Sequence, residues 1–249
     1  MRVFTKILKE SDGIMIARGD LGVEIPIEKV PLLQKEMIEK CRQQGKPVIT
    51  ATQMMESMMD NLVPSRADVS DVANAVFDLT DAVMLSGETA GGNYPIQVVK
   101  KMARILEQSE KQLSSAVLPR KSHNRVEAMV QAAMQMTYFT PKQEKKPSLI
   151  VVLSKTGSTV RLLSRLKPKI PILALVPSER VRDELILTWG VTPYFFDINV
   201  EALEFAEIFW FLKNNRLVKR GDLLIVLSGE IENAPGKAHM VTLKEVWDW

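Results

Sequence analysis

Three short apolar segments near the start of the chain are each followed by polar side chains that could do chemistry. The apolar segments are residues 14–17, 47–51 and 81–85, and the polar groups after them include Asp20, Thr52, Ser86 and Glu88. Continuous apolar runs of this length are typical of strands buried on both faces. Because catalytic groups gather at the carboxyl ends of parallel strands, the pattern predicts the layout of an enzyme barrel.

Asp20 is the strongest single candidate for a metal ligand. A carboxylate at the end of a strand suits Mg²⁺, which takes one or two carboxylates together with waters and substrate oxygens. The backbone N–H groups of Gly19 and Asp20 would face the same cavity, and exposed amides at a turn bind anions. The alternative is that Asp20 only caps the short helix that follows it.

Hydroxyl and carboxylate groups after the other two strands are candidates for proton transfer. Thr52 could orient a carboxylate or relay a proton, although a threonine directly after a strand is more often a helix N-cap. Ser86 and Glu88 lie two residues apart, and a carboxylate near a hydroxyl can hold and pass a proton. Arg18 fits a structural role in a subunit contact as well as it fits a role in the site.

Helices predicted between these strands would bring the strand ends together. One helix stops at Gly45, a second starts with a capping box formed by Ser65 and Asp68, and a third has Pro95 as its first residue. The expected apolar stripes are Val30, Leu33, Met37 and Cys41; Val69, Val72, Ala73, Val76 and Phe77; and Val98, Val99, Met102 and Leu106. Residues 1–110 therefore predict three βα units in series, joined by right-handed crossovers.

A second α/β domain is predicted for residues 126–249, after a polar connector at residues 111–125. The strand candidates are residues 149–153, 172–176, 191–196, 223–227 and 239–243, and helices fit at 157–167, 179–189 and 199–215. A further helix, with Val126, Met129, Val130, Ala133 and Met134 on its apolar face, precedes them. The last strand is shorter and more mixed, as edge strands often are. The series predicts an open doubly wound sheet.

The segment Ser154, Lys155, Thr156, Gly157, Ser158, Thr159 is a candidate anion site in this second domain. It lies between a predicted strand and a predicted helix, and it combines hydroxyls, a lysine and helix N-terminal amides. It lacks the Gly-x-x-x-x-Gly-Lys spacing of a P-loop. Glu230 and Glu232, in a loop expected nearby, would repel a phosphate. The alternative is a plain capped helix.

The composition argues against several other classes of protein. The formal net charge is only +3 and charges of both signs are interleaved, so nucleic acid is not an expected partner. The single cysteine, Cys41, excludes an internal disulfide and suits a reducing cytosol, and we expect it in the core. His123 and His239 have no second metal-type ligand close by, so zinc is not expected. No signal peptide is visible and no apolar run reaches the roughly 18 residues that span a bilayer, so we expect a cytoplasmic protein without a membrane partner.

Three motifs, in their order and spacing, resemble pyruvate kinase. They are Ala17-Arg-Gly-Asp-Leu-Gly-Val-Glu24, Ala51-Thr-Gln-Met-Met-Glu-Ser57 and Met84-Leu-Ser-Gly-Glu-Thr-Ala90, and residues 70–75 and 187–193 strengthen the match. The resemblance implies the last three βα units of a TIM-type (β/α) barrel, followed by an α/β effector-binding domain. It also implies transfer of the phosphoryl group of phosphoenolpyruvate to ADP, with Mg²⁺ (or Mn²⁺) and K⁺ as cofactors, in a homo-oligomer that is a tetramer in the family.

The resemblance assigns roles to the candidate residues. Asp20 is similar to the family's Mg²⁺ ligand, and the amides of Gly19 and Asp20 with the hydroxyl of Thr52 are similar to the groups that hold the carboxylate of phosphoenolpyruvate. Ser86 and Glu88 resemble the pair that helps to deliver the proton to the enol. The loop from Ser154 to Thr159 resembles the loop that grips a phosphate of a sugar-phosphate or nucleotide effector, although the family commonly has arginine where Ser158 stands.

Some parts of the family pattern are not found in this sequence. In the family, a catalytic lysine and a metal-binding glutamate come just before the position of Met1, and the K⁺ ligands, the lid domain and the earlier barrel strands lie further upstream. We therefore expect these residues alone to be inactive. One alternative is a truncated, non-catalytic member that acts as a binding or oligomerisation module. A weaker one is a carbon–carbon lyase that uses phosphoenolpyruvate chemistry on a similar barrel, and the phosphate-binding second domain argues against it.

Overall fold

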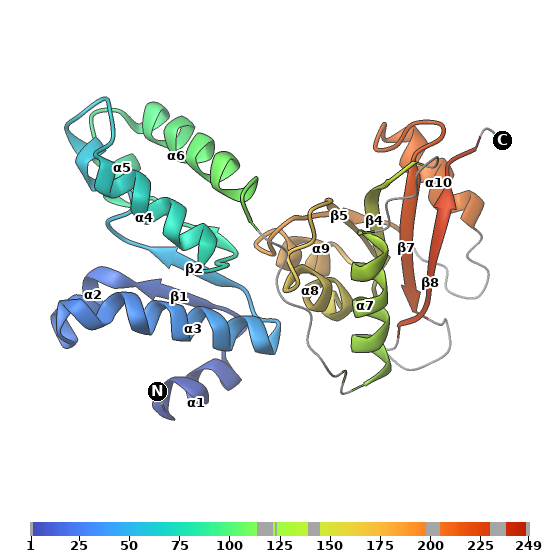
Figure 1. Cartoon of the computed structure of the whole chain (residues 1–249), viewed down its shortest axis with the longest axis horizontal. Helices are drawn as coiled ribbons and strands as arrows, with labels where there is room; N and C mark the ends of the chain where they lie inside the picture. The colour runs from blue at the N-terminus through green and yellow to red at the C-terminus, as the bar shows by residue number, and fades with distance from the viewer. Residues whose placement is uncertain are drawn as a thin grey trace. The chain divides into compact units, whose positions relative to one another are not determined.

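The chain divides into two compact units, Met1–Ser114 and Ser115–Trp249. The computed structural model describes residues 2–113, 122, 124–138, 145–197, 205–229 and 238–247. Each unit has its own sheet (Figure 1). Each also has its own hydrophobic cores.

Unit 1, residues 1–114, is built on a parallel three-stranded sheet in the order β1-β2-β3. Its elements are α1 (Arg2–Glu10), β1 (Ile14–Ala17), α2 (Arg18–Glu24), η1 (Ile27–Lys29), α3 (Val30–Gln44), β2 (Val48–Ala51), η2 (Glu56–Met59), α4 (Arg66–Phe77), β3 (Ala82–Val83), α5 (Gly87–Ala90) and α6 (Pro95–Glu110). Strands that are consecutive in sequence are neighbours in the sheet, with helices between them. This arrangement confirms the partial barrel predicted from the sequence.

The helix boundaries in unit 1 follow the predicted signals. The Ser65 side chain accepts a hydrogen bond from the Asp68 N–H, and the Asp68 carboxylate accepts one from the Ser65 N–H, so the capping box at the start of α4 is confirmed. Gly45 ends α3 in the left-handed conformation, with φ of 65°, which glycine adopts without a steric penalty. Pro95 is the first residue of α6, where its missing N–H costs nothing.

The buried helix faces differ from the predicted ones in three helices. In α3 the buried side chains include Gln34 and Ile38, while Leu33 and Met37 are half-buried. Three residues of the expected stripes of α4 and α6 are exposed, namely Val69, Phe77 and Val99. Successive side chains on a helix are about 100° apart, so apolar spacing alone does not decide which row faces the sheet, and in α3 the buried row includes the polar Gln34.

Two predicted strands of unit 1 are also corrected. Strand β1 is not buried on both faces, because Met15 is 51% exposed while Ile16 is buried. Strand β3 covers only Ala82–Val83 instead of residues 81–85. Backbone hydrogen bonds from Asp81 to Val48 (3.0 Å) and from Met84 to Thr50 (3.0 Å) nevertheless continue the pairing at both ends.

Helix α1 was not predicted from the sequence. It packs on unit 1 through Phe4 and Leu8, which are buried with Cys41 and Ile16 in one cluster. The Lys46 ammonium donates hydrogen bonds to the carbonyls of Leu8 (2.6 Å), Lys9 (2.9 Å) and Ser11 (2.6 Å). These carbonyls at the C-terminal end of α1 have no partner within the helix, so a cation is favourable there.

Unit 2, residues 115–249, contains a five-stranded sheet in the order β6-β5-β4-β7-β8, in which only β8 is antiparallel to its neighbour. Its elements are α7 (Arg125–Met136), β4 (Pro147–Leu153), α8 (Ser158–Ser164), β5 (Ile172–Val176), α9 (Glu179–Leu185), β6 (Val191–Phe195), α10 (Phe205–Asn214), β7 (Leu223–Gly229) and β8 (Ala238–Glu245). From β4 the chain adds β5 and β6 toward one edge of the sheet, and then returns to place β7 and β8 between β4 and the opposite edge.

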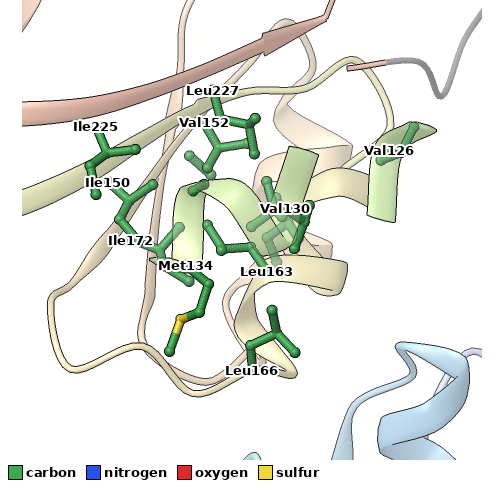
Figure 2. Close-up of a cluster of buried hydrophobic side chains, with 14 of the residues drawn as sticks. Val126, Val130, Met134, Ile150, Val152, Leu163, Leu166, Ile172, Ile225 and Leu227 are labelled. Carbon is green, nitrogen blue, oxygen red and sulfur yellow. The ribbon is translucent and has the colours of Figure 1, made fainter. Parts of the chain in front are cut away.

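Helices cover both faces of this sheet, as predicted for a doubly wound fold. On one face, side chains of α7 and α8 pack against alternate residues of β4, β5 and β7, and Figure 2 shows Val130, Met134 and Leu163 of this cluster beside Ile150 and Val152. On the other face, α10 packs its buried Ile208, Phe209 and Leu212 against the remaining residues of the same strands. Burying an aliphatic or aromatic side chain of this size contributes about 1.5–3 kcal/mol.

The element lengths in unit 2 differ from the predicted ones. The helices predicted at 157–167 and 179–189 are shorter, at Ser158–Ser164 and Glu179–Leu185. The last strand is longer, at Ala238–Glu245, because it pairs along the whole length of β7. Residues 199–204 of the third predicted helix and most of the predicted connector lie outside the described residues. Among the helices that the structure describes, none is long and apolar enough to cross a membrane.

Candidate functional site

The carboxyl ends of the three strands in unit 1 lie at one edge of the sheet. Parallel pairing places Ala17 opposite Ala51, and Thr50 opposite Val83. Asp20, Thr52 and Glu88 follow the three strands within a few residues. The structure therefore brings the predicted polar segments to the same edge, where enzymes of this architecture place their catalytic groups.

Thr52 makes direct contact with the first turn of α2. Its Oγ1 accepts a hydrogen bond from the Gly19 N–H at 2.9 Å, and its hydroxyl donates to the Ala51 carbonyl at 2.7 Å. Ala17, the N-cap residue of α2, provides no side-chain cap. Thr52 therefore satisfies a helix N–H as a cap would, but it does so for the helix of the preceding βα unit and not for the segment that follows it.

The backbone at Thr52 has an unfavourable conformation. Thr52 has φ of 66° and Gln53 has φ of 53°, so both residues lie in the left-handed region. A β-branched residue there is a steric outlier, and each such residue costs about 1–3 kcal/mol unless its surroundings impose it. Strained backbone of this kind is concentrated at functional sites.

Arg18 binds this strained turn within its own chain. Its Nε donates to the carbonyls of Ala51 (3.3 Å) and Thr52 (3.2 Å), and its Nη2 donates to the Thr52 carbonyl at 2.6 Å and to the Met54 Sδ at 2.9 Å. Its Nη1 lies 2.6 Å from the carboxylate of Asp71 on α4. The Arg18 side chain is 11% exposed. Arg18 therefore has a structural role inside unit 1, which differs from the subunit contact expected from the sequence.

Asp20 lies in the first turn of α2, where its side chain is exposed. No hydrogen bond or ion pair joins its carboxylate to another residue that the structure describes. Because Ala17 is the N-cap of α2, the alternative in which Asp20 caps this helix is wrong. The carboxylate is favoured at this position by the helix dipole, and its oxygens are available to a ligand.

A Mg²⁺ ion at this edge of the sheet would find one protein ligand in Asp20. Over the described parts of the chain, no three His, Cys, Asp or Glu side chains come together in a group that could hold a metal. Mg²⁺ is commonly bound through one or two carboxylates, with water and substrate oxygens in its other positions. The exposed Asp20 carboxylate fits this mode of binding, and it fits as one ligand among several.

Ser86 and Glu88 lie together, as the sequence implied. The buried Glu88 carboxylate accepts hydrogen bonds from the Met55 N–H (3.1 Å) and the Ser86 N–H (2.9 Å), and the Ser86 hydroxyl lies 3.5 Å from it. Burial acts to raise the pKa of Glu88, but hydrogen bonds from the backbone N–H groups of Glu88, Ser86, Met55 and Met54 outweigh it and lower the pKa below its ordinary value. Glu88 is therefore ionised at neutral pH and joins the turn after β2 to the turn after β3.

Cys41 has no part in this chemistry. It is fully buried in the cluster with Leu8, Ile16 and Ile38. Burial, with a further contribution from Asp81, raises the pKa of the Cys41 thiol to about 12. The burial confirms the prediction that Cys41 is a core residue. The raised pKa keeps Cys41 protonated at neutral pH, and the thiolate is the nucleophilic form.

The loop from Ser154 to Thr159 follows β4, next to the point where the strand order of unit 2 reverses. Ligands of doubly wound sheets bind at such points. Gly157 has φ of 75°, and its N–H donates to the Ser154 hydroxyl at 3.0 Å. Ser154 and Thr159 are buried, whereas Lys155 and Thr156 are exposed. Of the six predicted residues, Ser154, Gly157 and Thr159 are buried and shape the loop, Ser158 is half-buried, and Lys155 and Thr156 are exposed to a ligand.

Arg161 is a second cation at this loop, and the sequence analysis did not assign it. Its Nη1 donates to the Thr156 carbonyl at 3.1 Å, and its Nη2 pairs with Glu184 of α9 at 3.2 Å. Arg161 lies one turn into α8, the helix that follows Lys155. Its position in the sequence could therefore have indicated a second cation at this loop. Its bond to the Thr156 carbonyl depends on the left-handed turn at Gly157, which the sequence did not specify. Glu230 and Glu232 lie outside the described residues.

Comparisons with known proteins agree with the two units. The family described as pyruvate kinase, barrel domain, matches residues 1–99, and the family described as pyruvate kinase, alpha/beta domain, matches residues 127–243. A pyruvate kinase from Clostridium acetobutylicum is 42% identical over 242 residues, which are 96% of this chain and 51% of the relative. A pyruvate kinase from Dictyostelium discoideum is 40% identical over 252 residues, 98% of this chain and 49% of the relative.

The fold is also similar to that of a solved structure. A crystal structure of a pyruvate kinase from Cryptosporidium parvum matches with a TM-score of 0.83 and 36% sequence identity, over 98% of this chain and 48% of that chain. The chain thus spans about half the length of the relatives that it matches.

Proposed function

Because the chain belongs to the pyruvate kinase family, we propose that it serves the transfer of the phosphoryl group of phosphoenolpyruvate to ADP, which gives pyruvate and ATP. In this proposal unit 1 supplies one side of the catalytic site, and unit 2 is an effector-binding domain. The observation that carries the proposal is the convergence of Gly19, Asp20 and Thr52 at one edge of the sheet, where Gly19 and Thr52 are in direct contact.

The substrate carboxylate is held in this proposal by the N–H groups of Gly19 and Asp20 and by the Thr52 hydroxyl. The support is geometric: the Gly19 nitrogen and the Thr52 Oγ1 are 2.9 Å apart, so an anion at this point can accept from both. Amides at the start of a helix are favourable for an anion because of the helix dipole. Neither group has to move far to exchange its internal bond for a bond to the ligand.

Asp20 is the proposed Mg²⁺ ligand. When bound, the ion would neutralise charge on the transferred phosphoryl group, as in phosphoryl transfer generally. The support from this chain is an exposed carboxylate without a protein partner among the described residues. K⁺ and the catalytic lysine of the family are not assigned to any residue of this chain.

Ser86, Thr52 and Glu88 are the proposed groups for protonation of the enolate. Because the pKa of Glu88 is lowered, its carboxylate carries a charge at neutral pH and accepts hydrogen bonds. We therefore propose that Glu88 orients Ser86, and that a hydroxyl group carries out the proton transfer itself. The distance of 3.5 Å between the Ser86 Oγ and the Glu88 carboxylate is at the limit of a hydrogen bond.

The effector of unit 2 is proposed to be a phosphorylated small molecule bound at the loop from Ser154 to Thr159. Lys155 supplies one charge, and Arg161 could supply a second if it exchanged its bond with Glu184 for one with a phosphate. Ser158, where the family commonly has arginine, is half-buried and hydrogen-bonds to Thr156 at 3.1 Å. Assembly into a homo-oligomer is a further part of the proposal, on the basis of the family.

The proposal is tested by titrating the chain with phosphoenolpyruvate in the presence of Mg²⁺ while the backbone amides are followed by NMR. We expect shifts at Gly19, Asp20 and Thr52 in the wild-type chain. An Asp20→Asn variant should bind more weakly and should lose its dependence on Mg²⁺. Glu24→Gln, at the other end of α2, is the matched control and should bind as the wild type does. Shifts confined to unit 2, or no shifts at all, would contradict the proposal.

A second candidate function is a non-catalytic binding or oligomerisation module. It is favoured by the self-sufficiency of unit 2, whose sheet has a hydrophobic core on each face. A coupled assay for pyruvate formation, with the chain alone, separates the two candidates where the titration is positive: turnover requires the enzyme, and binding at unit 2 without turnover favours the module.

A further inference from the structure

The turn after β2 needs an external contact to keep its shape. Thr52 and Gln53 are consecutive residues with positive φ, at 66° and 53°. Neither is a glycine, and Thr52 is β-branched, so both would relax to another backbone region if the turn were free. The position of the Thr52 hydroxyl at the Gly19 N–H depends on this conformation. Whatever holds the turn also holds the two groups of the proposed carboxylate site together.

Arg18 is the side chain in contact with the turn. Its Nε and Nη2 donate to the Thr52 carbonyl, at 3.2 and 2.6 Å, and the Nε also approaches the Ala51 carbonyl at 3.3 Å. The turn is thus bound on both sides of the strained peptide, since the Thr52 side chain bonds to Gly19 and the Thr52 carbonyl bonds to Arg18. Arg18 and Gly19 are adjacent in sequence, so one short segment hydrogen-bonds to both the side chain and the carbonyl of Thr52.

The guanidinium of Arg18 is fully occupied by these internal contacts. The Nη2 has a second acceptor in the Met54 Sδ at 2.9 Å, and the Nη1 pairs with Asp71 at 2.6 Å. Every nitrogen of the group therefore has a partner within unit 1, and the side chain is 11% exposed. A guanidinium in this state is suited to holding protein groups, since binding a substrate would require these bonds to break.

Asp71 fixes the orientation of Arg18. It lies on α4, so the ion pair joins α4 to the start of α2, and the Arg18 fork then reaches the turn between β2 and η2. A planar guanidinium that binds a carboxylate through Nη1 and a carbonyl through Nε and Nη2 has little freedom to rotate. A lysine ammonium donates from a single nitrogen, so it lacks the separated nitrogens with which Arg18 reaches the turn carbonyls and the Asp71 carboxylate at once.

We propose that Arg18, anchored by Asp71, is a positioning residue that imposes the left-handed conformation of Thr52 and Gln53 and so places the Thr52 hydroxyl against the Gly19 N–H. The inference rests on the proposed function only for its consequence, which is a pre-formed site for the carboxylate of the substrate. The geometric part concerns the chain without any ligand and is measured without one.

The test uses the whole chain with Arg18→Lys, and with Arg42→Lys as the matched control. Arg42 is in the same unit and pairs with Glu39 on the surface of α3. The readout is the Gly19 amide, by its NMR shift and by its hydrogen-exchange rate. Loss of a charge-assisted bond predicts exchange of Gly19 roughly 10- to 100-fold faster in Arg18→Lys, and an unchanged rate in Arg42→Lys. An unchanged Gly19 amide in Arg18→Lys would overturn the inference.

Two further variants separate positioning from general stability. Gln53→Gly relieves the strain at one of the two residues, because glycine accepts positive φ. The double variant Arg18→Lys, Gln53→Gly should therefore recover part of the Gly19 protection, whereas a merely destabilising effect of Arg18→Lys would not be rescued. If Arg18→Lys loses the dispersed amide signals of unit 1 altogether, the inference is tested with Asp71→Asn instead. Asparagine keeps an acceptor for Arg18, so Gly19 exchange should become faster in this variant, but by less than the roughly 10- to 100-fold expected for Arg18→Lys. Full protection in Asp71→Asn would overturn the anchoring role of Asp71.

The same samples are then titrated with phosphoenolpyruvate and Mg²⁺, so that failure of the positioning inference and failure of the proposed function differ. If the wild-type chain shows no ligand-induced shift while Gly19 responds to Arg18→Lys as expected, the proposed function fails and the positioning holds. If the wild-type chain binds phosphoenolpyruvate at Gly19 and Thr52 but Arg18→Lys leaves both the amide and the affinity unchanged, the positioning fails and the function holds.

Discussion

Replacing Glu88 by glutamine should destabilise unit 1 by about 3 kcal/mol at neutral pH. The buried carboxylate accepts hydrogen bonds from the N–H groups of Met55 and Ser86, and hydrogen bonds to charged groups contribute about 1.5–3 kcal/mol each. Glutamine keeps one acceptor oxygen but places an NH₂ group against the other buried N–H. That N–H then has no acceptor, which costs about 1–3 kcal/mol in addition to the weaker remaining bond.

The effect should depend on pH in a defined direction. The pKa of Glu88 is lower in the folded chain than its ordinary value, since the backbone N–H groups outweigh the effect of burial. A carboxyl group of this kind stabilises the fold above its unfolded pKa and loses that contribution as the pH falls through its folded pKa. The difference between wild type and Glu88→Gln should therefore be complete at pH 7 and should shrink below the ordinary glutamate pKa of about 4.3.

Urea unfolding measures this difference if the two units are followed by separate probes. All four tryptophans lie in unit 2, at positions 189, 210, 247 and 249, so tryptophan fluorescence reports unit 2 alone. Hydrogen exchange of peptides that contain residues 48–58 and 84–92 reports unit 1. Glu36→Gln, at an exposed ion pair with Lys40, is the control and should change the stability by less than about 0.5 kcal/mol. A loss below about 1 kcal/mol at pH 7, or one that does not shrink as the pH falls well below about 4.3, would contradict this prediction.

Three further predictions follow from the two units. A polypeptide of these 249 residues should form pyruvate from phosphoenolpyruvate and ADP at least about a hundredfold more slowly than an ordinary enzyme, which turns over about 10 times per second. The reason is that Asp20 is the one charge assigned to the transferred phosphoryl group. A coupled assay that finds ordinary turnover would contradict this prediction. Residues 1–110 expressed alone should self-associate and bind a hydrophobic dye, since Val23, Ile27 and Leu32 are among many exposed apolar side chains of unit 1; a dye-free monomer with a cooperative melt would show otherwise. Residues 126–249 should fold alone and bind fructose 1,6-bisphosphate, ribose 5-phosphate or AMP weakly, with amide shifts at residues 154–159, because few cations serve the loop; shifts elsewhere, or none, would leave the loop as a helix cap.

Local signals in the sequence predicted the elements of the fold well. The capping box at Ser65, the left-handed stop at Gly45 and the proline at the start of α6 each depend on one or two neighbouring residues. The order of strands in unit 1 followed from the βα alternation alone. The rotation of the helices did not, because the buried row of α3 passes through a polar residue, Gln34, which donates a hydrogen bond to Asp78, the residue that follows α4, at 2.9 Å.

The contacts of the candidate site were harder to predict, because they join distant segments. Asp20, Thr52 and Glu88 were identified by residue type and by their positions after strands. The hydrogen bond from Gly19 to Thr52 spans 33 residues, and the pairing of Arg18 with Asp71 spans 53. The sequence also gave no sign that Thr52 and Gln53 adopt positive φ, since neither residue type favours it. The roles came from the resemblance, and the geometry that supports them came from the folded chain.

Strand β4 has a consequence for how unit 2 comes apart. Its alternate residues enter different cores, with Ile150 and Val152 packed under α7 and α8 and with Val151 and Leu153 packed under α10. It is also the strand that pairs with both β5 and β7. If β4 detaches, both cores open to water and the sheet separates into two halves in a single event. The two faces of unit 2 therefore share one cooperative unit of unfolding, and the loop from Ser154 to Thr159, which continues directly from β4, is fixed for as long as that unit is intact.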